Sequence, residues 1–347
     1  MKAVVLFDLG KYEIREVDKP ACPPKGLLVE VLYVGLCGSD LRTLFSGHRN
    51  IKLPAILGHE VSGRVAELGP EYAGGYKTGD ILAVAPDVYC GNCSFCKAGK
   101  FEFCENLREL AQHWPGGFAE YMAIPPEALA LGVISPIPAG LSPAQATLAE
   151  PSSSCISAQE KLGIGFGDTV LIIGSGPIGC IHTCLARAHG ARTVIVADIK
   201  DDRLHMCKSF GADYTVNSSR ESLEESVKKL TSGRGPDVVI TANPVAQTQI
   251  QAVNLVARGG RIAFFGGLPQ GRSQVTLDTN QIHYKGVTVI GTNGFAPRHF
   301  QTALELTAQG KILADKLVTH ILPLGDFAKG VDLAREGKAI KVVYQAR

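Results

Sequence analysis

The chain has 347 residues, and its 35 Lys and Arg against 33 Asp and Glu give a formal net charge of +2. This balance offers no basic excess for nucleic acid, and no apolar run reaches the roughly 18 residues of a membrane span, so neither is expected as a partner. Hydrophobic residues at 45% and charged residues at 20% exclude wholesale disorder, and the length suggests two domains at roughly 100–200 residues each.

Short β-strands are predicted in the first part of the chain. Three stretches are rich in β-branched or alternating apolar residues, at 29–34, 63–65 and 80–84. Gly and Pro interrupt the chain closely around them. This pattern predicts an irregular β-barrel.

From about residue 145 onward, strands and helices alternate. Continuous apolar runs predict buried strands at 169–173, 193–197, 237–240, 261–265 and 287–290. Helices are predicted between them at 177–189, 201–210, 222–230 and 246–256. Such alternation predicts a parallel sheet with helices on both faces, so the fold class is α/β with a doubly wound sheet. The expected domains are 1–147, 148–290 and a C-terminal segment, 291–347, that returns to the first domain.

The N-terminal residues show no signal-peptide pattern, since an acid, Asp8, interrupts the first apolar run. A cytoplasmic location is therefore expected, where thiols stay reduced. Clustered cysteines in such a chain indicate metal binding more often than disulfides.

A glycine-rich motif connects the first buried strand to the helix after it. The string Gly174-Ser175-Gly176-Pro177-Ile178-Gly179 has the G-x-G-x-x-G spacing of dinucleotide sites. Gly174 allows a tight turn, Gly176 allows close approach of a pyrophosphate, and Gly179 allows the helix to pack on the strand. The free N–H groups at the helix N-terminus favour phosphate.

The next predicted strand ends at Asp198, where a carboxylate can accept hydrogen bonds from the ribose hydroxyls of NAD and repel the 2′-phosphate of NADP. NAD is therefore the expected cofactor, although Lys200 and Arg203 follow closely and weaken that preference. The loops after two later strands lie at the ligand-binding edge of such a sheet. We expect them to line the nicotinamide half through Gly266, Gly267, Thr292 and Asn293.

Four cysteines with short spacing, Cys90, Cys93, Cys96 and Cys104, form the strongest single motif. Four thiolates can close a tetrahedral shell around Zn²⁺, which leaves no position for substrate. A structural zinc site is the leading interpretation. An iron–sulfur cluster and unligated thiols remain alternatives.

A second metal centre is suggested by residues that are distant in sequence. Cys37, His59, Glu60 and Glu150 supply sulfur, nitrogen and oxygen donors. A thiolate, an imidazole and a carboxylate together make an open zinc site, whose free position binds water or a substrate oxygen.

Taken together, these motifs resemble the zinc-containing medium-chain alcohol and polyol dehydrogenases over essentially the whole chain. The motifs are Cys37-Gly38-Ser39-Asp40, Gly58-His59-Glu60, the four-cysteine lobe, Gly116-Gly117-Phe118-Ala119-Glu120-Tyr121, Glu150-Pro151 and the glycine loop. The resemblance implies a GroES-like barrel, a Rossmann domain, an active site in the cleft between them, and homodimers or homotetramers.

The resemblance also implies residue roles. Cys37 and His59 would bind the catalytic zinc, and either Glu60 or Glu150 would be the third ligand while the other holds the metal-bound water. Glutamate at position 150 resembles the sorbitol, threonine and galactitol-phosphate branches more than the ethanol branch. Ser39 would relay the proton of the substrate hydroxyl, and Asp40 would orient its neighbours. The expected reaction passes a hydride between a secondary alcohol of a polyol or sugar derivative and NAD.

One position departs from many members of the family. Arg42 stands where they carry a relay histidine, and a guanidinium does not act as a base at neutral pH. Arg42, His48, Arg49 and Lys52 can attract an anionic substrate such as a polyol phosphate, or simply form a solvated basic loop. Two other functional classes stay open: a zinc-free enone or quinone reductase of the same fold, and a non-enzymatic NAD-binding redox sensor.

Overall fold

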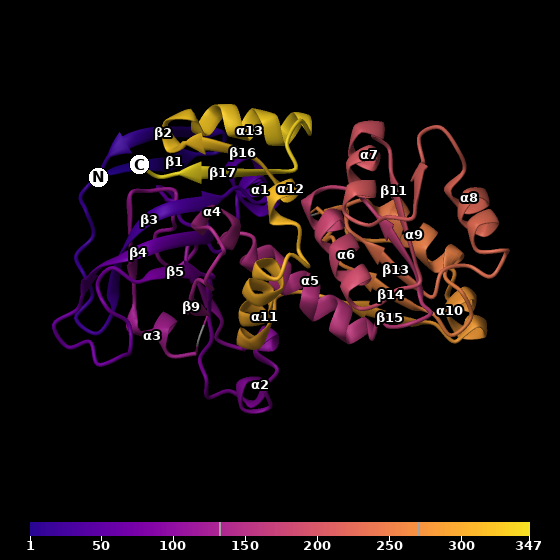
Figure 1. Ribbon diagram of the computed structural model, residues 1–347, viewed down its shortest axis with the longest axis horizontal. Coiled ribbons are helices and arrows are strands. Elements are labelled where there is room, and N and C mark those ends of the chain that lie inside the picture. Colours follow the sequence, from indigo (N-terminus) through magenta and orange to yellow (C-terminus); the bar gives the residue numbers. More distant parts are fainter. Residues whose placement is uncertain (132, 270) are drawn as a thin grey trace. The chain divides into compact units, whose positions relative to one another are not determined.

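The computed structural model describes residues 1–131, 133–269 and 271–347, and it divides into two compact units (Figure 1). Unit 1 comprises Met1–Ser153, Phe295–Gly310 and Ala314–Arg347. Unit 2 comprises Ser154–Gly294 and Lys311–Leu313. The predicted domain limits, 147 and 290, fall a few residues before these breaks.

Among the described residues, unit 1 contains one seven-stranded sheet and two smaller sheets of two strands each. Its strands are β1 (Lys2–Asp8), β2 (Lys11–Glu16), β3 (Leu27–Gly35), β4 (Glu60–Leu68), β5 (Ile81–Val84), β6 (Asp87–Val88), β7 (Arg108–Glu109), β8 (Tyr121–Ile124), β9 (Ile134–Pro136), β16 (Val318–Pro323) and β17 (Lys341–Gln345). Its helices are α1 (Gly38–Ser46), α2 (Ser94–Lys97), α3 (Pro126–Leu129), α4 (Pro143–Ala146), α11 (Pro297–Ala308), α12 (Ala314–Leu317) and α13 (Phe327–Glu336). Helix α5 (Ala149–Leu162) begins in unit 1 and continues into unit 2.

The main sheet of unit 1 has the order β16-β17-β3-β4-β5-β9, with β8 also paired to β3. The C-terminal strand β17 is therefore a direct neighbour of β3, to which it runs antiparallel. Its Tyr344 packs with Phe118 and Phe327 in the core, at ring-centroid distances of 5.8 and 5.0 Å. The C-terminal segment thus completes the core of unit 1 and places β17 beside β3 (Figure 1).

Unit 2 contains a six-stranded parallel sheet in the order β12-β11-β10-β13-β14-β15. Its strands are β10 (Thr169–Ile173), β11 (Thr193–Asp198), β12 (Tyr214–Asn217), β13 (Val238–Thr241), β14 (Arg261–Phe264) and β15 (Thr288–Gly291). Its helices are α6 (Pro177–Ala188), α7 (Asp201–Ser209), α8 (Leu223–Leu230), α9 (Ala246–Leu255) and α10 (Thr279–Lys285). All five residues of the central strand β10 are buried, which explains its uninterrupted apolar sequence.

The parallel α/β architecture predicted for this half is confirmed. Strand β12 was not predicted from the sequence, because Tyr-Thr-Val-Asn is short, polar at its end and half-exposed at the edge of the sheet. Among the described residues, no helix is both long enough and apolar enough to cross a membrane.

Candidate functional site

Three of the predicted metal ligands come together in unit 1. Cys37 is the residue before α1, His59 is the residue before β4, and Glu60 is the first residue of β4. The sulfur of Cys37, a ring nitrogen of His59 and a carboxylate oxygen of Glu60 all lie within 4.8 Å of one another. One ion can therefore contact all three donors.

Asp40 connects the first two of these residues. Its Oδ2 accepts a hydrogen bond of 2.9 Å from the backbone N–H of Cys37. Its Oδ1 lies 3.2 Å from Nδ1 of His59. With Nδ1 engaged, Nε2 of His59 is the nitrogen left for a metal, and the hydroxyl of Ser39 lies 3.3 Å from it.

Two effects act in opposite directions on the pKa of His59. Burial lowers the pKa, but the carboxylate of Asp40 and the neighbouring Cys37 outweigh burial and raise it well above its usual range. The site thus favours positive charge at this position. A cation that binds Nε2 would be stabilised by the same negative groups.

Glu60 is completely buried. Oε2 forms an ion pair with Nζ of Lys341. Apart from this ion pair, neither carboxylate oxygen has a hydrogen-bond partner among the described residues. A buried carboxylate oxygen without a partner is costly, and a bound metal ion would satisfy it.

Lys341 was not identified from the sequence. It opens β17 and is only 3% exposed. Burial lowers its pKa, but the charges of Glu60, Cys37 and Glu150 together raise it above the ordinary value. Nothing local in the sequence distinguishes this lysine from an exposed lysine at a strand end.

Glu150 lies in the first turn of α5, in the electrostatic neighbourhood of His59, Glu60 and Lys341. Burial raises its pKa to about 7. It does not belong to the set of donors within 4.8 Å of one another. The structure therefore groups Cys37, His59 and Glu60 as donors and leaves Glu150 beside them.

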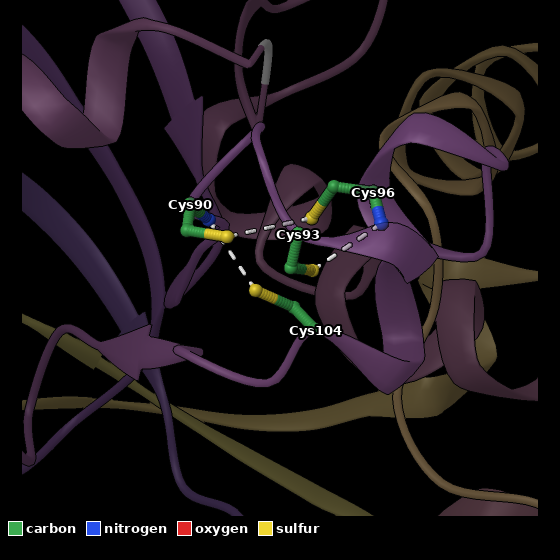
Figure 2. A group of neighbouring side chains, drawn as sticks. All are labelled: Cys90, Cys93, Cys96 and Cys104. Carbon is green, nitrogen blue, oxygen red and sulfur yellow. Dashed lines mark hydrogen bonds between the residues drawn. The ribbon is translucent and has the colours of Figure 1, made fainter.

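The four cysteines of the second motif also come together (Figure 2). Their sulfur atoms lie within 4.8 Å of one another, with 4.0 Å between Cys90 and Cys96. The backbone N–H of Cys90 points to Cys104, at 3.3 Å, and that of Cys96 to Cys93, at 3.4 Å. Backbone hydrogen bonds from Asn92 and Cys93 lower the pKa of Cys90 to about 6, which favours a thiolate. Four sulfurs at these distances fit a tetrahedral zinc ion.

The glycine motif joins β10 to α6 as predicted from its sequence. Gly174 has a φ of +112°, a conformation that favours glycine. A Cβ on Gly179 would lie 1.9 Å from the carbonyl oxygen of Gly174, so only glycine allows this close packing. A Cβ on Gly176 would meet nothing within 4 Å, which leaves the start of α6 open to a phosphate.

Asp198 ends β11 and holds this loop in place. Its Oδ2 accepts hydrogen bonds from the backbone N–H and the hydroxyl of Ser175, at 2.7 and 2.8 Å. Its Oδ1 accepts from the backbone N–H groups of Ile199 and Lys200, at 2.7 and 3.1 Å. Four donors of the chain thus fix the carboxylate at the carboxyl edge of the sheet. Arg203 follows in the first turn of α7, partly buried.

The other predicted cofactor residues follow the neighbouring strands. Gly266 follows β14, where a Cβ would lie 2.2 Å from the carbonyl oxygen of Asn243, while Gly267 is open. Thr292 and Asn293 follow β15, and the hydroxyl of Thr292 is buried without a hydrogen-bond partner among the described residues. Asn243 was missed from the sequence: its side chain donates to the carbonyl of Ile173, at 2.9 Å, and so ties β13 to the start of the glycine loop.

Comparison with known proteins adds an independent observation. Residues 23–134 match the alcohol dehydrogenase GroES-like domain, and residues 177–309 match the zinc-binding dehydrogenase domain. The chain is 32% identical to a sorbitol dehydrogenase of Halalkalibacterium halodurans, over 99% of this chain and 98% of that protein. The chain belongs to the zinc-containing medium-chain alcohol and polyol dehydrogenases.

Two further relatives of this family are informative. An erythritol/L-threitol dehydrogenase of Mycolicibacterium smegmatis is 35% identical, over 99% of this chain and 96% of that protein. A zinc-binding dehydrogenase of Sinorhizobium meliloti 1021, whose crystal structure was solved with NADP, has a TM-score of 0.91 and 32% identity, covering 99% of this chain and 98% of that one.

Membership in this family confirms the GroES-like and Rossmann folds and an oxidoreductase activity on CH–OH groups that uses zinc and a nicotinamide cofactor.

Proposed function

We propose that this polyol dehydrogenase oxidises a secondary hydroxyl of a polyol or sugar derivative to a ketone, with NAD as hydride acceptor and a catalytic zinc held by Cys37, His59 and Glu60. The observation that carries the proposal is the set of sulfur, nitrogen and oxygen donors within 4.8 Å of one another. The buried, unpartnered Oε1 of Glu60 fits the same ion. Zinc bound there would lower the pKa of a substrate hydroxyl in its open position.

Glu150 and Ser39 supply the proton path in this proposal. Burial raises the pKa of Glu150 to about 7, so this carboxyl exchanges protons near neutral pH, as a general base requires. The hydroxyl of Ser39, 3.3 Å from Nε2 of His59, lies where it can pass a proton. Together they replace the relay histidine that Arg42 cannot supply.

NAD in preference to NADP is supported by Asp198. Its four hydrogen bonds from the chain hold a carboxylate where the adenosine ribose binds in this fold. A fixed negative charge repels a 2′-phosphate. The cofactor contacts in this proposal are Gly174, Gly176, Pro177, Ile178, Gly179, Asp198, Arg203, Gly266, Gly267, Thr292 and Asn293.

The charge of the substrate is a separate question, raised by the basic segment after α1. Burial lowers the pKa of His48, the charge of Glu109 opposes this effect, and Arg49 and Arg42 nearby lower the pKa further. A local excess of positive charge favours an anionic group on the substrate, such as a phosphate. Neutral polyols and their phosphates, compared as pairs at low and high salt, separate this possibility from a solvated basic loop.

The proposal is tested by metal analysis and by an activity panel. Freshly purified protein should contain about two zinc ions per chain, one for the four cysteines and one for the catalytic centre. NADH formation should be observed with members of a panel of polyols, sugar alcohols, their phosphates and L-threonine. One zinc per chain, with activity only toward enones or quinones, would instead support a zinc-free reductase. Cytoplasmic location and a homodimer or homotetramer are also proposed, and light scattering tests the latter.

A further inference from the structure

One buried ion pair lies directly beside the proposed catalytic metal centre. Glu60 opens β4 and Lys341 opens β17, with side-chain exposures of 0% and 3%. Strand β3 lies between these two strands in the sheet, so the pair crosses an intervening strand. A buried ion pair is weak evidence for a stabilising role, because both charges lose their hydration. The role of this pair is therefore better explained by the neighbouring metal centre than by the stability of the fold.

Gly35, at the end of β3, leaves room for this pair. It is the cross-strand partner of Glu60 in the sheet. A Cβ at this position would lie 2.0 Å from Oε2 of Glu60 and 3.0 Å from Cε of Lys341. Any side chain here would displace the carboxylate or the lysine.

The ion pair with Nζ of Lys341 is made by one oxygen of Glu60, Oε2. Apart from this pair, neither carboxylate oxygen has a hydrogen-bond partner among the described residues. We propose that Lys341 is a positioning residue that holds one carboxylate oxygen of Glu60, so that only the other is available to the metal and a coordination position stays open for substrate. This inference rests on the proposed function, because it requires a metal at Cys37, His59 and Glu60.

Loss of Lys341 should change the strength of metal binding in the direction opposite to that expected for a purely structural lysine. Without Lys341, both oxygens of Glu60 become available to the metal, and a positive charge near that cation is removed. The metal should then be held more tightly while substrate binds less well. If Lys341 only supported the local fold, its loss would loosen the metal.

The experiment measures zinc release to a chromophoric chelator from Lys341→Met and from a matched control, Lys338→Met. Lys338 lies three residues earlier, is 68% exposed and pairs with Glu336 at the surface. The four-cysteine site in each protein is an internal reference, and a His59→Ala variant identifies the catalytic phase of release. Lys341→Met should release the catalytic zinc at least tenfold more slowly, with the four-cysteine phase unchanged and kcat/KM at least tenfold lower. Lys338→Met should match the wild type.

Two further measurements keep the inference testable if Lys341→Met does not fold. Lys341→Gln keeps a hydrogen-bond donor but no charge, and should slow release in the same direction. The visible absorption of cobalt(II)-substituted Lys341→Gln should weaken, as expected when the coordination number rises. Release at the wild-type rate or faster in the folded variants overturns the inference. A wild-type chain with a single zinc overturns the proposed function and this inference with it, whereas two zinc ions and an unaltered release rate overturn this inference alone.

Discussion

Asp40 joins Cys37 to His59: one carboxylate oxygen accepts from the backbone of Cys37 at 2.9 Å, and the other lies 3.2 Å from Nδ1 of His59. The same side chain is only 3% exposed, so water cannot replace it. It therefore sets the ring nitrogen that faces the metal. This role agrees with the expectation that Asp40 orients its neighbours.

Replacing Asp40 by Asn should lower the zinc affinity of the catalytic centre by about 10- to 100-fold, the usual effect of losing a carboxylate behind a histidine ligand. Competition with a chelator measures this affinity. The four-cysteine zinc of the same protein should be unaffected. An unchanged catalytic-site affinity would contradict the role given to Asp40.

Replacing Cys104 by Ser should reduce bound zinc from about two ions to about one per chain, because a tetrahedral site with three thiolates binds zinc weakly. The segment from Cys90 to Cys104 contains only short elements, α2 and a 3₁₀ turn, so it depends on the metal for its conformation. Limited proteolysis should therefore cut this segment in the variant and spare it in the wild type. Equal resistance in both proteins would show that thiols alone hold the lobe.

Glu150→Gln should remove the rise of kcat with pH that a base of pKa about 7 produces. In the wild type, activity should increase as pH rises through 7, because the carboxyl must be deprotonated to accept a proton. The variant should show lower kcat at every pH and no inflection near 7. An identical pH profile in both enzymes would show that a group other than Glu150 accepts the proton.

Asp198→Ala should change cofactor choice. Loss of the carboxylate removes the charge that repels a 2′-phosphate and frees the backbone of Ser175, Ile199 and Lys200. The KM for NAD should rise at least tenfold, while that for NADP should fall. If NADP is already the better cofactor of the wild type, the NAD assignment is wrong.

His182 predicts a pH dependence of stability in unit 2. Burial lowers its pKa to about 3, whereas in the unfolded chain it is about 6.5. Between these values the unfolded state binds the extra proton, so stability falls as pH falls, by about 1.4 kcal/mol per pH unit for this one group. This contribution is present above pH 6.5 and is lost progressively toward pH 3.

His182→Leu should reduce that slope by about this amount, measured by urea unfolding at pH 6.5, 5.5 and 4.5. The exposed His283→Gln is the matched control and should keep the wild-type slope. Equal slopes in all three proteins would mean that His182 is protonated or solvated in the folded state.

The sites that sequence reasoning found most directly are those built within a short window. The four cysteines and the glycine loop each lie within fifteen residues, so spacing alone predicts which atoms can meet. Cys37, His59 and Glu60 come from two segments, so their ligand types suggested a metal site but their spacing could not show that they meet. Their convergence depends on the pairing of β3 with β4, which periodicity indicates but does not fix in register.

Lys341 and Asn243 could not be predicted for the same physical reason. Lys341 reaches Glu60 because β17 pairs with β3 across most of the chain length, and its local sequence is that of an ordinary strand. Asn243 matters because β13 lies beside β10 in the sheet. Contacts set by strand order become visible only once the fold is known. The two hydrogen bonds from Ser175 to Asp198 belong to the same class.

The central claim is that a second zinc ion, held by Cys37, His59 and Glu60, carries the dehydrogenase activity. Its most direct test is the zinc content and polyol oxidation of the wild type beside His59→Ala, both measured on freshly purified, folded protein. The account predicts about two zinc ions per chain in the wild type, and about one in the variant with activity lost. A variant that keeps both its zinc content and its turnover would contradict the account.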